Sequence, residues 1–180
     1  FFALRGLADA AWLARTLGDT SAATIAAWHD DFRRDLSASV AATMRKHRID
    51  FVPGAADLGD FDPTSTTILL SPVDAPSVAP EGALERTFDR YWRESEARRR
   101  GERTWENYTP YELRTVGALV RLGRPERALT MLDFFLRDQR PPEWRAWAEV
   151  VWRDAKAPKF VGDIPHTWVA SDFIRSALDL

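Results

Sequence analysis

The sequence contains no cysteine, carries almost no net charge and has no long apolar run, and each absence removes a class of function. Without cysteine, the 180-residue chain forms no disulfide and offers no thiolate to a metal. A net charge of −2 gives no electrostatic basis for binding DNA or an acidic membrane surface. No apolar run approaches the roughly 20 residues needed to cross a membrane. We therefore predict neither a nucleic-acid partner nor a membrane partner.

Several well-defined catalytic motifs are also absent. The chain has no Gly-rich phosphate loop, no Gly-x-Ser-x-Gly nucleophile elbow and no His-Glu-x-x-His pair. The acid-rich segment Asp57–Asp62 does not match the spacing of an EF-hand loop. We predict no cofactor and no metal site.

Apolar residues recur at steps of three and four, which is typical of amphipathic helices. In the second predicted helix the repeating residues are Ile25, Trp28, Phe32, Leu36 and Val40. The predicted helices cover about 1–17, 21–47, a short segment after Pro63, 81–100, a helix marked by Tyr111 to Val120, its partner marked by Leu129 to Leu136, and about 166–179. Seven helices and no convincing strand predict an all-α fold.

Two helix pairs share the same connection. Leu17 and Gly18 end one helix, and Leu122 and Gly123 end another, each before a short turn and a second apolar helix. We interpret this as a repeated helical hairpin. Long connections at 49–62, 101–109 and 139–166 hold most of the aromatic, acidic and histidine residues outside the apolar stripes. Because loops on a rigid scaffold commonly carry function, these connections predict one functional face.

The first candidate loop has three carboxylates in six residues, Asp57, Asp60 and Asp62. Asp60 is a candidate for a sugar-hydroxyl clamp, a general acid or base, or a ligand of a hard cation. The alternative is a solvated turn in which Asp62 caps the helix that starts at Pro63.

The second candidate segment lies before the helix marked by Tyr111. Its aromatic rings suit stacking on sugar faces, and its polar groups suit hydrogen bonds to hydroxyls. Its candidate residues are Trp105, Glu106, Asn107, Tyr108 and Arg114. The alternative is a helix start with Thr109 as the cap, Pro110 in the first turn and Glu112 in a capping box, which leaves Trp105, Asn107 and Tyr108 unexplained.

The third candidate is Glu149, which lies among Trp144, Trp147 and Trp152. A carboxyl among indole rings loses hydration water, which favours its neutral form and suits proton transfer near neutral pH. The alternative is a packed amphipathic segment in which Glu149 pairs with an arginine.

The fourth candidate is His166, at the start of the last helix. Asp163 and Trp168 flank it, and the imidazole suits a hydrogen bond to a ligand hydroxyl or the movement of a proton. The alternative is a structural histidine at a helix start. His29 and His47 lie within the second helix, and we interpret them as surface or packing residues.

Five segments together resemble bacterial six-hairpin glycosidase-like proteins. The segments are Phe-Phe-Ala-Leu-Arg-Gly-Leu-Ala-Asp-Ala-Ala (1–11), Pro-Gly-Ala-Ala-Asp-Leu-Gly-Asp-Phe-Asp-Pro-Thr-Ser-Thr-Thr (53–67), Tyr-Thr-Pro-Tyr-Glu-Leu-Arg (108–114), Trp-Ala-Glu-Val-Val (147–151) and Gly-Asp-Ile-Pro-His-Thr-Trp-Val-Ala-Ser-Asp-Phe (162–173). The resemblance implies helical hairpins that form roughly half of an (α/α)6 toroid. It further implies that residues 1–180 are the C-terminal portion of one domain, whose N-terminal part lies upstream and is the missing partner. Any targeting signal would lie there too, so no compartment is predicted.

The resemblance implies a glycoside hydrolase that acts on a carbohydrate through two carboxylic acids, one protonating the leaving oxygen and one activating water. It makes Glu149 the candidate base, with Asp60, Glu106 or an upstream residue as the acid. The sugar platform would be Trp105, Tyr108, Trp147 and Trp168, with Arg114 and His166 on hydroxyls.

Two other functions stay open. A polysaccharide lyase on the same toroid needs a base and a group that neutralises the uronate, and Asn107, Tyr108, Arg114 and His166 supply such groups. A non-catalytic helical-repeat scaffold would bind peptides in a groove along the stack. The concentration of polar and aromatic residues in the long loops argues against the scaffold.

Overall fold

The computed structural model describes residues 1–154, 157 and 159–180. These residues form seven α-helices, three short 3-10 helices and two strands of two residues each, so the predicted all-α fold class is confirmed. The chain divides into two compact units, Phe1–Thr87 and Phe88–Leu180, and the boundary falls inside helix α4 (Ala83–Arg99). Sequence analysis did not predict this boundary.

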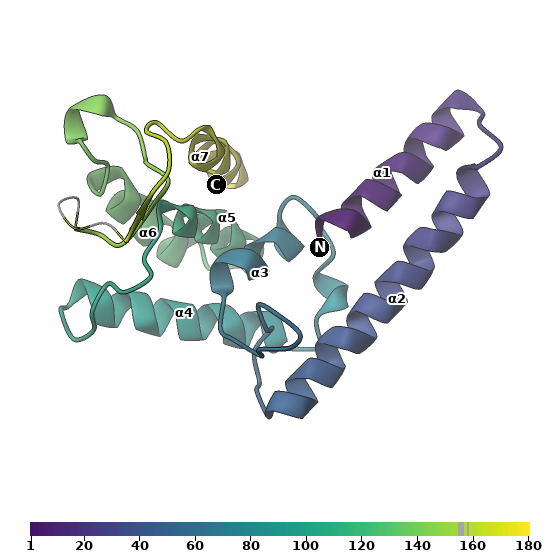
Figure 1. Cartoon of the computed structure of the whole chain (residues 1–180), viewed down its shortest axis with the longest axis horizontal. Helices are drawn as coiled ribbons and strands as arrows, with labels where there is room; N and C mark the ends of the chain where they lie inside the picture. Colours follow the sequence, from purple (N-terminus) through teal and green to yellow (C-terminus); the bar gives the residue numbers. More distant parts are fainter. Residues whose placement is uncertain (155–156, 158) are drawn as a thin grey trace. The chain divides into compact units, whose positions relative to one another are not determined.

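The first unit begins with a helical hairpin, α1 (Phe2–Leu17) and α2 (Ala22–His47), which Figure 1 shows side by side. The hairpin matches the prediction, including the stop at Gly18. Gly18 has a left-handed φ of 69°, and its N–H donates to carbonyls in the last turn of α1. Leu4, Ala11 and Ala14 of α1 are buried.

The predicted apolar stripe of α2 is only partly buried. Val40 is buried, but Trp28 is 58% exposed and Phe32 is 37% exposed. The spacing correctly indicated a helix, but it does not show how much of the apolar stripe is covered. Helix α2 packs against α1 and against the 3-10 helix at Pro76–Val78, and these neighbours leave Trp28 and Phe32 partly exposed.

The loop after α2 is held by its own aspartates. Asp62 caps α3 (Pro63–Leu70), accepting a hydrogen bond from the backbone N–H of Ser65 at 3.0 Å, as predicted. Asp60 Oδ1 accepts from the backbone N–H of Ala55 at 2.9 Å, which closes the turn. A 3-10 helix, η1 (Pro76–Val78), follows α3.

The second unit contains the C-terminal part of α4, then η2 (Pro110–Leu113), α5 (Arg114–Arg121), α6 (Pro125–Arg137), η3 (Pro142–Trp144) and α7 (Thr167–Asp179). Helix α5 packs against both α6 and α7. Gly117 permits the close approach of α7, because a Cβ there would lie 2.9 Å from an Asp179 oxygen and 3.3 Å from Ser176 Oγ. The hairpin of α5 and α6 matches the prediction.

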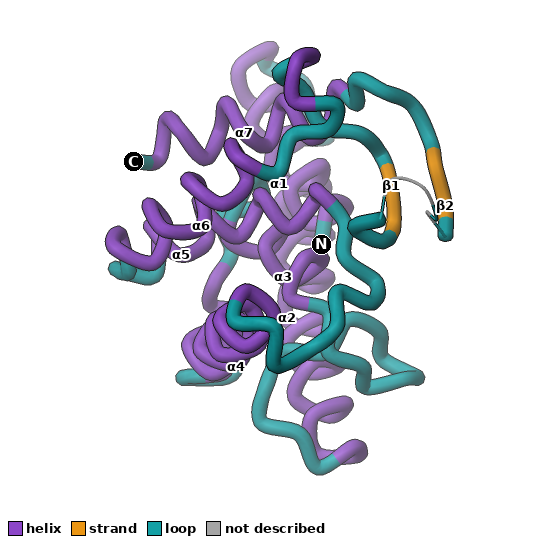
Figure 2. The backbone as a smooth tube through the Cα atoms, turned by 90° about the vertical axis from the view of Figure 1, so that its left-hand side faces the viewer, coloured by secondary structure: helices purple, strands orange, loops and turns teal. Residues whose placement is uncertain are grey.

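The predicted loop 139–164 contains a short antiparallel pairing that the sequence did not reveal. Strands β1 (Val150–Val151) and β2 (Phe160–Val161) pair with Val150 opposite Val161 (Figure 2). Two-residue strands carry no readable alternation, so only the pairing itself shows them. This pairing brings residues 147–149 beside residues 161–166.

Glu112 does not form the predicted capping box. Its carboxylate is buried and accepts a hydrogen bond from Tyr91 Oη at 2.8 Å and from both terminal nitrogens of Arg98, at 2.9 and 2.6 Å. Thr109 still accepts from the backbone N–H of Tyr111, at 3.4 Å. Burial and the Glu112 charge raise the pKa of Tyr91. The bidentate pair with Arg98 wins over the local cap because the buried guanidinium needs a counter-charge.

Candidate functional site

Three backbone hydrogen bonds hold the loop that carries Glu149 against the loop that leads into α7. The N–H of Gly162 donates to the Glu149 carbonyl at 2.6 Å, and the N–H of Glu149 donates to the Asp163 carbonyl at 3.0 Å. The N–H of His166, at the N-cap of α7, donates to the Trp147 carbonyl at 2.8 Å. These bonds extend the β1–β2 pairing and fix both loops.

The two loops bring Glu149, Asp163 and His166 together. One side-chain atom from each lies within 4.8 Å of the other two. His166 Nδ1 is 2.5 Å from an Asp163 oxygen and 4.0 Å from Glu149 Oε2. The imidazole is 10% exposed, whereas the side chains of Glu149 and Asp163 are 35% and 62% exposed. A nearly buried imidazole thus faces two carboxylates that reach solvent.

Tyr111 of η2 extends the hydrogen bond between Asp163 and His166 into a chain, because its hydroxyl is hydrogen-bonded to His166 Nε2. Burial and the charge of Glu149 raise the pKa of Tyr111, while Arg114 opposes the shift. The phenol therefore keeps its proton near neutral pH and donates to Nε2. The proton of a neutral His166 is then on Nδ1, where it donates to Asp163.

Arg114 lies beside this chain rather than in it. Its guanidinium is 4.4 Å from the centre of the Tyr111 ring, and its Nε donates to Asp172 of α7 at 2.5 Å. Burial raises the pKa of Asp172, and the hydrogen bond and charge of Arg114 oppose that shift. The pair with Asp172 neutralises Arg114 and ties the first residue of α5 to α7, so the guanidinium holds the Tyr111 ring in place.

Gly162 is required beside Glu149. A Cβ at this position would lie 2.2 Å from Glu149 Oε2 and 2.9 Å from Glu149 Cβ, although the backbone of Gly162 is not left-handed. Any larger residue would push the Glu149 side chain away from His166.

The three tryptophans around Glu149 lie in different surroundings. Trp147 is 5% exposed, and its indole N–H donates to the Phe135 carbonyl at 2.9 Å. Trp144 and Trp152 are exposed. The groups that face Glu149 are thus His166 and Asp163 rather than indoles, and Trp147 packs in the core instead of offering a free face.

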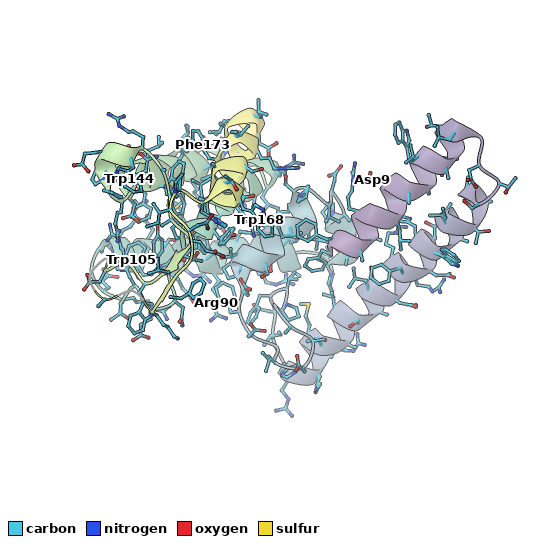
Figure 3. All side chains as sticks on the ribbon, turned by 45° about the horizontal axis from the view of Figure 1, so that its top comes forward. Asp9, Arg90, Trp105, Trp144, Trp168 and Phe173 are labelled. Atoms are coloured by element: carbon cyan, nitrogen blue, oxygen red, sulfur yellow. The ribbon has the colours of Figure 1, made fainter. Side chains whose placement is uncertain are left out.

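Trp168 has the open ring that a sugar platform needs. It lies in the first turn of α7, is 67% exposed, and its ring centre is 6.2 Å from that of His166 (Figure 3). Of the predicted platform residues, Trp168 lies beside the cluster of Glu149, Asp163 and His166.

Trp105 and Tyr108 belong to a second cluster in the same unit. The Trp105 ring stacks on Phe134, with centres 5.2 Å apart, and Arg98 and Arg153 lie over it at 4.7 and 4.6 Å. Tyr108 is 1% exposed, and its hydroxyl donates to Asp138 at 2.7 Å. Burial and the Asp138 charge raise the pKa of Tyr108 well above its usual value. Tyr108 therefore packs inside, and we leave it out of the site.

A hollow of about 420 Å³ opens beside this second cluster. It is lined by Arg99, Trp105, Thr130, Asp133, Phe134, Arg137, Asp138 and Arg153. Its arginines have carboxylate partners, since Arg99 pairs with Glu96, Arg137 with Asp133 and Arg153 with Asp138.

Three further predicted residues, Glu106, Asn107 and Asp60, are not members of the Glu149 cluster. Glu106 is exposed, and Asn107 has a left-handed φ of 54°, as asparagine tolerates in a turn. Asp60 belongs to the first unit.

Sequence reasoning did not select Tyr111 and Asp172 as site residues. Tyr111 and Arg114 are three positions apart, a helical spacing that places both on one face. This spacing could have pointed to Tyr111 as a neighbour of the predicted site residue Arg114. No sequence signal marked Asp172, because its pairing with Arg114 depends on the approach of α7 to α5.

Comparison of the chain with protein-family models, with curated proteins and with solved structures found no match. Within the described residues, no helix is both long enough and apolar enough to cross a membrane.

Proposed function

We propose that this protein is a carbohydrate-active enzyme, a glycoside hydrolase that acts on an oligo- or polysaccharide with Glu149 as its general base. The observation that carries the proposal is the placement of Glu149, a partly exposed carboxylate 4.0 Å from an imidazole that is itself fixed by Asp163 and Tyr111. The resemblance of five segments to six-hairpin glycosidase-like proteins supports the same reading.

Glu149 can take a proton from water because its carboxylate reaches solvent and, among the described residues, its ion-pair partner is His166 rather than an arginine. Trp168 supplies an open aromatic face for a sugar ring. Both ring nitrogens of His166 are engaged, by Asp163 and Tyr111, so its part is to hold these two side chains beside the base.

Asp163 is placed to orient His166 rather than to act as the acid of an inverting mechanism. Inverting enzymes separate their two carboxyl groups by about 6.5–9.5 Å to admit water, whereas retaining enzymes hold them about 5–5.5 Å apart. The Glu149 and Asp163 oxygens approach within 4.8 Å. The acid partner in an inverting reaction would be Glu106 or another residue.

The test is a screen of the purified protein against a panel of oligosaccharides with three readouts: new reducing ends, ultraviolet absorbance of an unsaturated product, and the anomer released. New reducing ends without ultraviolet absorbance support the hydrolase. An inverted anomer assigns Glu149 a distant acid partner, and a retained anomer assigns it Asp163. No turnover on any sugar would overturn the proposal and favour the scaffold.

One observation favours a second function, a polysaccharide lyase. Tyr111, hydrogen-bonded to His166 and stacked against Arg114, gives a tyrosine–histidine pair with a cation nearby. Such a pair can remove a proton next to a uronate carboxylate. Turnover that requires uronates and yields an ultraviolet-absorbing product would select this function.

We expect Trp168→Ala to raise KM about 3- to 10-fold with kcat little changed. Loss of one stacking face costs roughly 0.5–1.5 kcal/mol of binding. The matched control is Trp144→Ala, because Trp144 is 59% exposed on η3 and is not part of the cluster. Equal KM values for Trp168→Ala and the wild type would remove Trp168 from the binding surface.

We expect Gly162→Ala to lower kcat/KM about 10- to 100-fold, since a misplacement of the order of 1 Å can cost that much. The added methyl group displaces Glu149 while leaving the core untouched. Gly6→Ala is the control, because nothing lies within 4 Å of a Cβ there. Unchanged kinetics in Gly162→Ala would show that the position of Glu149 is unimportant.

A further inference from the structure

The cluster of Glu149, Asp163 and His166 offers one imidazole nitrogen and two carboxylate oxygens within 4.8 Å of one another. Imidazole nitrogen and carboxylate oxygen are the protein ligands of Zn²⁺ outside thiolate sites, with bonds of about 2.0–2.2 Å. Such bonds place ligand atoms roughly 3.4 Å apart around a tetrahedral ion. The separation of 4.0 Å between His166 Nδ1 and Glu149 Oε2 is close to that value.

The local charge favours a cation. Glu149 and Asp163 contribute two negative charges, and Arg114, which lies over the Tyr111 ring, is paired with Asp172 at 2.5 Å. Two like charges so close together are stabilised by a divalent ion.

The histidine ligand is also held in place by its neighbours. His166 is nine-tenths buried, its backbone is fixed to Trp147, and its Nε2 is bonded to Tyr111. A histidine ligand commonly bonds a partner through its second nitrogen, which fixes the ring. Tyr111 stands in that position, so Nδ1 is the nitrogen aimed at the two carboxylates.

We propose that Glu149, Asp163 and His166 bind one divalent transition-metal ion of the Zn²⁺ class, with water completing its coordination. The ion takes the place of the proton at Nδ1, and the neutral imidazole carries its proton on Nε2 instead, where it donates to the Tyr111 hydroxyl oxygen. The exposed ends of Glu149 and Asp163 rotate onto it from the solvent side, and the buried imidazole stays fixed.

The ligand set selects against calcium and magnesium. Ca²⁺ takes six to eight oxygen ligands, and Mg²⁺ retains most of its water and prefers oxygen donors. An imidazole with two carboxylates suits Zn²⁺ and its neighbours in the first transition row.

Binding of the ion and the proposed hydrolysis use the same carboxylate. When Glu149 ligates a metal, its oxygen lone pairs are engaged, so it no longer accepts a proton from water. We therefore expect Zn²⁺ to inhibit turnover. This consequence rests on the proposed function, whereas binding itself does not.

The test is isothermal titration calorimetry of the purified, chelator-treated protein with Zn²⁺ and, separately, Ca²⁺. We expect one Zn²⁺ per chain with a Kd of roughly 10 μM or tighter, and at least about 10-fold weaker binding of Ca²⁺. Glu149→Gln and Asp163→Asn should each weaken Zn²⁺ binding at least about 10-fold. Both side chains are partly exposed, so both variants should melt at the wild-type temperature.

The matched control is His29→Gln. His29 Nδ1 lies 3.0 Å from Asp30, so this is also a histidine–aspartate pair. Among the described residues, no third metal-binding side chain joins this pair. Tyr111→Phe keeps all three ligands and removes the partner of Nε2, so we expect a loss of roughly 10-fold. His29→Gln should bind Zn²⁺ as the wild type does.

Zn²⁺ binding no tighter than millimolar, or equal binding by Glu149→Gln and the wild type, would overturn the metal site. Loss of binding in His29→Gln alone would place the ion elsewhere and also overturn it. The two proposals can be contradicted separately, because Zn²⁺ binding without sugar turnover contradicts only the proposed hydrolase function. Turnover that depends on Glu149 without Zn²⁺ binding sinks only the metal site.

Discussion

Replacing Glu149 by glutamine should lower kcat on the best oligosaccharide at least about 10³-fold. The amide keeps the size of the side chain but cannot accept a proton from water, and the Nδ1 of His166 is already committed to Asp163. KM should change little, because the amide still hydrogen-bonds a hydroxyl. Steady-state kinetics of the purified variant, with its melting curve, measure both effects.

The control for this variant is Glu143→Gln. Glu143 is exposed on η3, within the same long connection, and is not part of the cluster. Its kinetics should equal those of the wild type. Retention of more than about a tenth of the wild-type kcat in Glu149→Gln would remove Glu149 from the mechanism.

Glu112→Gln should destabilise the second unit by about 3–5 kcal/mol, the usual cost of leaving one partner of a buried pair uncompensated. Glu112 and Arg98 are 8% and 12% exposed, and the carboxylate holds both Arg98 and the buried Tyr91 hydroxyl. The neutral amide leaves the guanidinium charged and unpaired. For a chain of this size the loss corresponds to a fall in Tm of roughly 6–20 °C, measured by circular dichroism.

A surface pair of the same kind is the control. Glu102 accepts two hydrogen bonds from Arg100, but both side chains are 55% exposed, so Glu102→Gln should melt with the wild type. A double variant, Arg98→Met with Glu112→Leu, should recover much of the lost stability, because apolar residues of similar volume tolerate burial. Equal melting of Glu112→Gln and Glu102→Gln would show that the buried network contributes nothing.

The helices were readable from the sequence because their signals are local. The stop at Gly18, the cap at Asp62 and the proline at the start of α6 each act within one turn, so spacing alone located them. The apolar stripe of α2 predicted the helix but not the exposure of Trp28 and Phe32, since periodicity marks an apolar face but not whether a neighbour covers it. The boundary between the two units lies inside the continuous helix α4, where the sequence has no break in its helical pattern.

The candidate site was only partly readable. The segments around Glu149 and His166 were selected by their residue types, but their meeting depends on the β1–β2 pairing, whose strands are too short to show alternation. The sequence around Glu112 indicated a helix-capping role. In the structure its carboxylate instead binds Arg98, which lies far away in the sequence. Tyr108 and Trp147 have the residue types of a sugar platform, yet burial decides their role, and burial is set by packing.

The measurement that tests the central claim most directly is rescue of Glu149→Ala by azide, with the sugar product identified by NMR. Azide is a nucleophile that needs no general base, so it can attack the anomeric carbon where the deprotonated water would have attacked. We expect millimolar azide to raise the turnover of Glu149→Ala at least about 10-fold and to yield a glycosyl azide. Glu143→Ala should show no such gain. Turnover of Glu149→Ala that azide leaves unchanged, with the protein folded and the wild type active, would contradict the placement of Glu149 at the reacting carbon.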